Sequence, residues 1–93
     1  MVPPHWLPVP LGHVVITPAA AGLLTQPEVV TALRRHASGD WGEVDDDDRR
    51  ANDAALQHEA RLLSAYTSAS GTQFWVITEA DRSVTTVLLP DDY

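Results

Sequence analysis

The apolar positions change their spacing about two thirds of the way along the chain. Up to residue 59 they recur every three or four positions, which is typical of amphipathic helices. From residue 61 they alternate with polar positions, which is typical of half-buried strands. A short β-branched run at 13–17 adds one strand ahead of the helical part. The pattern therefore predicts a strand, two or three helices, and then three strands.

Local signals set the helix boundaries. Thr17 followed by Pro18 is a typical N-cap and first-turn pair, and it begins a helix that runs to residue 24. Thr25 and Glu28 have the spacing of a capping box and begin a second helix, which ends near residue 36. The two glycines that follow separate this helix from a third, which is predicted over about 45–59.

Turn-forming residues at 68–71 and 80–83 divide the last third into strands at 61–67, 72–79 and 84–89. Turns this short join antiparallel neighbours, so the three strands are expected to form a meander. We therefore predict an α+β fold, β-α-α(-α)-β-β-β, with the helices packed on one face of the sheet.

The domain organisation follows from where the prolines lie. Residues 12–93 are predicted to form one α+β domain. Residues 1–11 contain four prolines and are predicted to form an extended arm, which Trp6 and Leu7 anchor on the body.

The composition limits the classes of function. The 93 residues include thirteen acidic and six basic ones, all arginine, which gives a net charge of −7. An acidic chain is a poor passive ligand for nucleic acid, because such binding depends on neutralising phosphates. There is no cysteine, and His5, His13 and His58 lie at no recognised metal spacing, so no metal or other cofactor is expected. No segment approaches a membrane span, and we expect a cytoplasmic location.

The run RHASGDWGE at 35–43 is the densest chemical signal in the sequence. It combines Arg35, His36, Asp40 and Trp41 with two glycines, which is more than a helix C-terminus needs. Simpler interpretations exist, since His36 suits a helix C-terminus and Trp41 suits a core. A functional site here requires that the strands bring further polar side chains to Arg35, His36 and Asp40.

Four stretches of the chain resemble a family of small bacterial proteins that are labelled plasmid-related or type I restriction endonuclease subunit M. They are RRHASGDWGEV, DDRRANDAAL, RLLSAY and FWVITEADRSVTTVLLPDDY, and the resemblance extends from His13 to Tyr93. It implies an association with plasmids, phages or other mobile DNA. The methyltransferase that the second label implies needs a glycine-rich cofactor loop after its first strand, which this sequence lacks.

The predicted order of elements is also similar to that of the RelE/ParE-type toxins and related small ribonucleases. This similarity implies RNA cleavage without a metal, by a base, an acid and a cation that stabilises the phosphorane. The residues whose types fit catalytic roles are His36, Glu79, Arg61 and Tyr66. Those that fit substrate binding are Arg35, Asp40, Trp75 and Arg82. The structural alternative for Arg61 and Glu79 is a cross-strand ion pair.

Two non-enzymatic hypotheses stand beside the ribonuclease. The run Asp45, Asp46, Asp47 and Asp48 is either a solvated helix N-terminus or a surface that imitates phosphate. In the second case the protein is an acidic accessory factor, an anti-defence protein or nucleic-acid mimic, that binds a host protein. The other hypothesis is a homodimer that pairs through an edge strand at 84–89. RNA or a host protein is thus the expected partner, and contact with a membrane is not expected.

Overall fold

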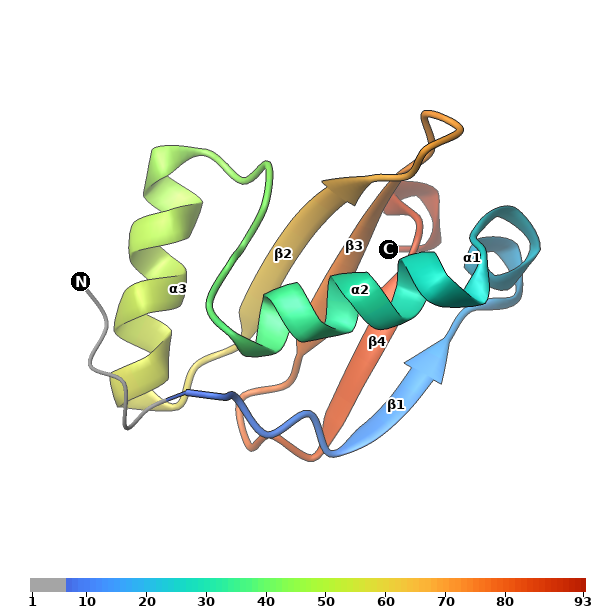
Figure 1. Cartoon of the computed structure of the whole chain (residues 1–93). Coiled ribbons are helices and arrows are strands. Elements are labelled where there is room, and N and C mark those ends of the chain that lie inside the picture. The colour runs from blue at the N-terminus through green and yellow to red at the C-terminus, as the bar shows by residue number, and fades with distance from the viewer. Residues whose placement is uncertain (1–6) are drawn as a thin grey trace.

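A computed structural model describes residues 7–93 (Figure 1). The elements are β1 (His13–Ile16), α1 (Pro18–Leu23), α2 (Gln26–Ala37), α3 (Asp46–His58), β2 (Leu62–Thr67), β3 (Gln73–Thr78), β4 (Val84–Leu88) and a closing 3-10 helix (Pro90–Asp92). The predicted α+β class is confirmed, and every predicted helix and strand is present.

The predicted arm at 1–11 lies partly outside the described residues, because residues 1–6, and with them Trp6, are not included. Residues 7–11 contain neither helix nor strand. Val9 is buried and donates its N–H to the carbonyl of Ala37, and Leu7 packs against the cluster that contains Trp41. This segment therefore lies against the C-terminal end of α2.

The four strands form one mixed sheet in the order β1-β4-β3-β2. β2, β3 and β4 form the predicted antiparallel meander, and β1 pairs with β4 in parallel. The prediction of an edge strand at 84–89 is wrong, since β4 lies between β3 and β1. No local signal could show this, because the partners His13 and Val84 lie near opposite ends of the chain.

One face of the sheet carries the main core. Tyr66, Phe74, Val76 and Val87 are buried there, and the strand register places them on the same side. They pack with small residues of α1 and α2, including Ala32, and Figure 1 shows α2 crossing in front of the sheet. Alanine at these positions brings the helix backbones close to the sheet.

The helix ends are fixed by the residues that the sequence indicates. The Thr17 hydroxyl accepts from the N–H of Ala20, and Thr25 and Glu28 form both bonds of a capping box. At the other end of α2, the N–H of Asp40 bonds to the carbonyl of Arg35. This bond, with a second from Gly39, ends the helix in a Schellman motif, which requires the positive φ of 84° at Gly39.

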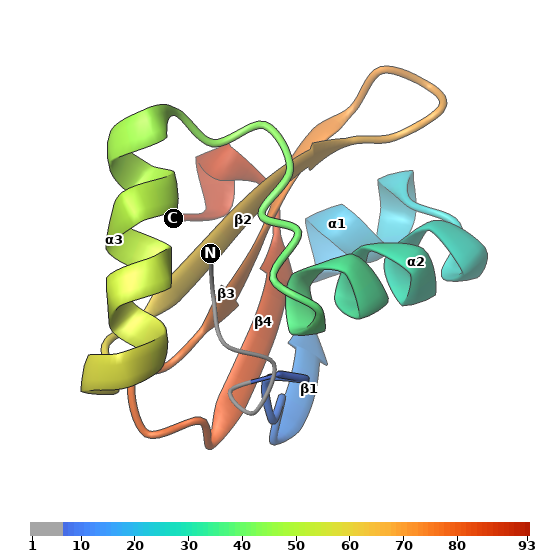
Figure 2. The ribbon, with the colours of Figure 1, turned by 60° about the vertical axis from the view of Figure 1, so that its left-hand side comes forward.

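The outer edge of β2 is covered by the segment between α2 and β2 (Figure 2). The Asn52 side chain of α3 donates to the carbonyl of Leu63 and accepts from its N–H, at 2.7 and 3.0 Å. Further along, Gly42 forms a parallel bridge with Ala65. Gly42 has a φ of 73°, and a Cβ there would collide with the carbonyl of Ala65 and the ring of Tyr66. Only glycine therefore fits against this edge.

Candidate functional site

The structure divides the predicted catalytic cluster into separate places. His36 lies inside the core. Contacts join Arg35, Asp40 and Tyr66 in a second place. Arg61 contacts Tyr93 in a third place. The single cleft on which the ribonuclease hypothesis depends is therefore not formed by the described residues.

His36 is fully buried, with an exposed fraction of 0%. Its Nδ1 lies 2.6 Å from the Ser64 hydroxyl, and its Nε2 lies 2.8 Å from the Thr78 hydroxyl. The chain of contacts continues from Thr78 to Thr85 at 2.7 Å, and from Thr85 to the carbonyl of Leu11 at 2.7 Å. Five groups from α2, three strands and the N-terminal segment are thus joined inside the core.

The Leu11 carbonyl, at the end of this series of contacts, determines which groups donate. The carbonyl of Leu11 can only accept, so Thr85 donates to it, and Thr78 must then donate to Thr85. His36 in turn donates through Nε2 to Thr78. Burial, with a smaller contribution from the Arg82 charge, lowers the pKa of the ring from 6.5 to about 4, so the ring is neutral near pH 7 and its Nδ1 accepts from Ser64.

This arrangement makes His36 a structural residue. A general base must reach the proton that it removes, whereas His36 is enclosed and both ring nitrogens already have partners. The hydrogen-bond partners Ser64, Thr78 and Thr85 were missed from the sequence. They occupy core-facing positions of the alternating strand pattern, and a polar residue at such a position is the signal that could have found them.

Arg35, Asp40 and Tyr66 do come together, which is part of what a functional site at this helix end requires. Arg35 holds the Asp40 carboxylate with two bonds, from Nε at 2.7 Å and from Nη2 at 3.2 Å. The Arg35 hydrogen bond lowers the pKa of Asp40. The guanidinium also lies 4.6 Å from the centre of the Tyr66 ring, whose hydroxyl donates to the carbonyl of Asp40. Burial raises the pKa of Tyr66 to about 12, so this phenol stays protonated.

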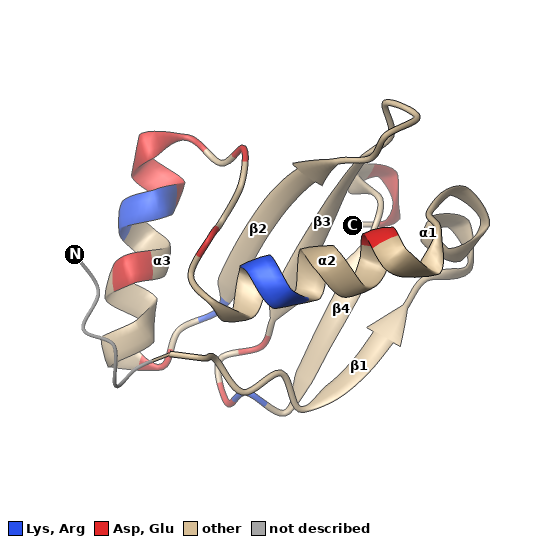
Figure 3. Ribbon diagram, viewed as in Figure 1, with Lys and Arg blue, Asp and Glu red and all other residues tan. Residues whose placement is uncertain are grey.

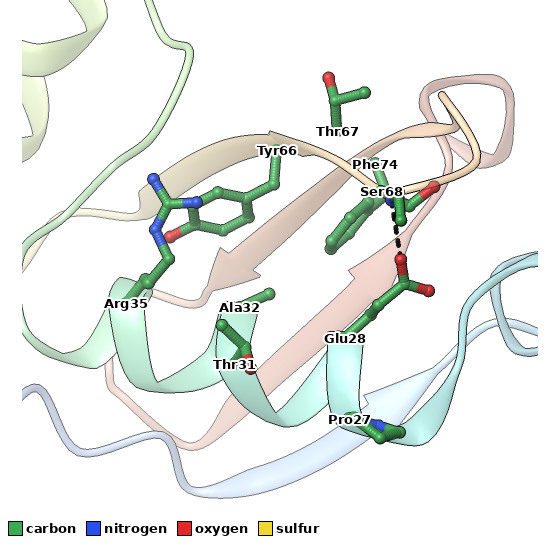
Figure 4. Close-up of a pocket in the computed structure, with 10 residues that line it drawn as sticks. Pro27, Glu28, Thr31, Ala32, Arg35, Tyr66, Thr67, Ser68 and Phe74 are labelled. Carbon is green, nitrogen blue, oxygen red and sulfur yellow. Dashed lines mark hydrogen bonds between the residues drawn. The ribbon is translucent and has the colours of Figure 1, made fainter.

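A pocket of about 290 Å³ opens beside this group, between α2 and the β2–β3 hairpin (Figure 4). Arg35 and Tyr66 lie at one end of it and Glu28 lies at the other, with Phe74 and Ala32 between them. The Glu28 carboxylate is already bound, because it accepts from the N–H groups of Thr25 and Ala69. Both charged groups of the pocket are thus engaged within the protein.

Arg82, a predicted substrate-binding residue, holds two parts of the fold together. Its guanidinium donates to the carbonyls of Ala55 and Ala60 at 2.9 and 2.8 Å, and to those of Glu79 and Ala80 at 3.1 Å each. The first two carbonyls lie at the C-terminal end of α3, where a cation also suits the helix dipole. Arg82 therefore joins α3 to the β3–β4 turn.

The other predicted site residues lie apart from the group formed by Arg35, Asp40 and Tyr66. Strand alternation places Trp75 on the sheet face opposite Phe74, where its ring packs edge-on against Tyr93 at 5.8 Å. Arg61 donates to the Tyr93 hydroxyl. Glu79 is exposed where β3 ends, and no ion pair joins it to Arg61 within residues 7–93. The cross-strand pair considered from the sequence is therefore not formed.

The acidic run forms the start of α3, as predicted (Figure 3). Asp45 is the N-cap and accepts from the N–H of Asp48. Asp46 and Asp47 pair with Arg49 and Arg50 one turn later, but their side chains remain 77% and 89% exposed. Every residue from 46 to 51 is exposed, so the rest of the described structure covers little of the first half of α3.

Three further observations bear on function. Within residues 7–93, no three His, Cys, Asp or Glu side chains are grouped so that they could hold a metal ion. In the same part of the chain, no helix is both long enough and apolar enough to cross a membrane. No family model, curated protein or solved structure matches the sequence, so the resemblance to plasmid-related proteins and to RelE/ParE-type toxins stays a prediction.

Proposed function

We propose that the protein is a non-enzymatic, acidic accessory factor that binds a basic surface of another protein through the first half of α3. The exposure of every residue from 46 to 51 carries this proposal. None of these six residues is buried, and an isolated helix of this length is marginal in water. They are stabilised instead by the Asp45 cap and the two ion pairs, which leave the carboxylates accessible.

The chemistry of this half helix indicates the class of partner. Asp46, Asp47 and Asp48 follow each other at the helix N-terminus, so their carboxylates point in different directions from one rigid support. Closely spaced anions on a rigid support resemble nucleic-acid phosphates, and the net charge of −7 attracts a basic partner over a distance. A host protein with an arginine- or lysine-rich surface is the partner that fits.

The residues predicted for RNA cleavage lie in several separate parts of the fold. His36 is enclosed, Arg82 is bound to backbone carbonyls, and Arg61 and Glu79 lie away from Tyr66. A metal-independent ribonuclease needs its base, acid and cation around one phosphate.

The test compares two charge-reversed variants as baits in a bacterial lysate. Asp47→Lys/Asp48→Lys changes the exposed half of α3, and Glu59→Lys/Asp91→Lys makes the same change of net charge elsewhere. We expect the wild type and the second variant to capture the same basic protein at low salt, and the first variant to lose it. Capture should also fail at about 1 M salt, where the Debye length is about 3 Å. Equal capture by both variants would contradict the proposal.

A further inference from the structure

One edge of the sheet is covered by other parts of the chain, and the other edge is not covered by the described residues. The outer edge of β2 is covered by Asn52 and by the bridge from Gly42. On the other edge, β1 has β4 as its one neighbouring strand among the described residues. An uncovered edge strand of β-branched residues is a template for pairing with another strand, and proteins usually protect it with charge or proline. His13–Ile16 contains neither.

The backbone of β1 presents a defined set of groups at this edge. The N–H of His13 bonds to Ser83 and that of Thr17 bonds to Val87, so alternate residues face β4. The N–H and C=O groups of Val14 and Ile16 are therefore directed outward. Val14 and Val15 are also 43% and 40% exposed, which is unusual for adjacent valines in a strand.

An apolar flank lies beside this edge. Ile16 and Val29 line the same hollow between β1 and α2. Val30 is 41% exposed and lies one helical turn from Leu33, which is partly buried against the core next to Val29. Strand alternation places Val14 on the same side of the sheet as Ile16. A chain that pairs with β1 would therefore also cover apolar side chains of α2.

The distribution of charge indicates what covers this edge. All thirteen acidic and six basic side chains lie from Glu28 onward, so the first 27 residues have no Asp, Glu, Lys or Arg. Figure 3 shows β1 and α1 without either colour, while the acidic residues gather on α3 and the turns. Two molecules of charge −7 repel each other, and pairing through β1 keeps their acidic α3 helices far apart, with Asp92, which accepts from the Thr17 hydroxyl, as an acidic residue at the end of this edge.

We infer that β1 pairs with β1 of a second copy of this chain, antiparallel and about a twofold axis at Val15. In this register Val14 of one copy faces Ile16 of the other, and the outward groups form four hydrogen bonds. The two sheets then join into one of eight strands. Because α3 lies at the opposite edge, beside β2, the dimer carries its two acidic helices at its outer ends (Figure 2).

Cysteine cross-linking tests the register on a chain that has no cysteine of its own. In a non-hydrogen-bonded antiparallel pair, the Cα atoms are about 4.5 Å apart, which suits a disulfide. Val15→Cys should therefore form a disulfide-linked dimer under mild oxidation. Val14→Cys should not, because its own copies are offset by two residues along the strands and lie beyond the limit of about 7 Å. Gln57→Cys, on α3, is the exposed control.

Light scattering tests the dimer itself. The wild-type chain should have the mass of two copies, and Val14→Pro should have the mass of one. Proline is tolerated where the N–H of an edge strand faces outward, so this variant removes an intermolecular donor and keeps the sheet. A wild-type mass of one copy at all concentrations would overturn the inference. Cross-linking of Val15→Cys no faster than that of Gln57→Cys would overturn it as well, even if Val14→Pro failed to fold.

Discussion

At the scale of single residues, the molecule uses its most reactive side chains to hold the fold. His36 joins Ser64 to Thr78 inside the core, and Arg82 binds four carbonyls. Both were predicted as functional residues because their types suit phosphate chemistry. The same types also suit buried polar connections, and only the three-dimensional partners distinguish the two roles.

The buried His36 makes stability depend on pH. Below its ordinary pKa of 6.5 the unfolded chain takes up a proton on His36, whereas the folded chain keeps the ring neutral down to about 4. The free energy of unfolding should therefore fall between pH 6.5 and 4, by about 3 kcal/mol in total. Urea denaturation at several pH values measures this slope. Between pH 6.5 and about 5, above the range in which the carboxyl groups titrate, the slope should disappear in His36→Gln and persist in His58→Gln. A slope that survives there in His36→Gln would contradict the assignment.

A second prediction at this scale concerns the contribution of Arg82 to stability. Arg82→Lys keeps the charge but loses the planar guanidinium that reaches carbonyls of both α3 and the β3–β4 turn. We expect the free energy of unfolding to fall by about 2 kcal/mol. Arg34→Lys, at an exposed position of α2, should change it by less than about 0.5 kcal/mol. Equal effects of the two substitutions in denaturant titrations would show that the carbonyl contacts stabilise nothing.

At the scale of elements, local chemistry made the helices and strands predictable. The Thr17 cap, the capping box at Thr25 and the Asp45 cap act within four residues, and each begins a helix where the sequence indicates. The turns of the meander are equally local. The place of β1 beside β4 was not predictable in this way, because it depends on residues near opposite ends of the chain.

The hydrogen bonds that cover the edge of β2 lead to a third prediction, about stability and aggregation. Asn52→Ala removes both bonds to the Leu63 backbone and leaves a partly buried N–H and C=O without partners. Such groups cost about 1–3 kcal/mol each, so we expect unfolding at clearly lower urea concentrations. The uncovered edge should also promote aggregation, which light scattering during heating would detect. Gln57→Ala, on the exposed side of α3, is the control, and aggregation at the same temperature in both variants would contradict this role of Asn52.

At the scale of the whole molecule, the functional site was less predictable than the fold. The sequence analysis grouped His36, Arg61, Tyr66 and Glu79 because their residue types suit catalysis. Whether such side chains meet depends on contacts between distant parts of the sequence. The partners of His36 lie 28 and 42 positions away in the sequence. What the sequence did indicate correctly is the acidic helix start at Asp45–Asp48, because its charge and capping are local properties.

The molecule as a whole separates its surfaces by charge. β1, whose own residues include no Asp, Glu, Lys or Arg, forms one edge of the sheet, and the acidic α3 lies beside the other edge. In the proposed account, the β1 edge joins two copies of the protein and the first half of α3 binds the basic partner. A dimer with two acidic helices would bind a partner that has two basic sites more tightly than either helix alone.

The exchange of backbone amides in the captured complex tests the account most directly. In the free protein, we expect the amides of residues 49–51 to have little protection, because the side chains of this part of α3 are exposed. We predict that the partner slows hydrogen exchange there and leaves exchange around the pocket of Arg35 and Tyr66 unchanged. Slower exchange at that pocket, with residues 49–51 unaffected, would contradict the claim that the first half of α3 is the binding surface.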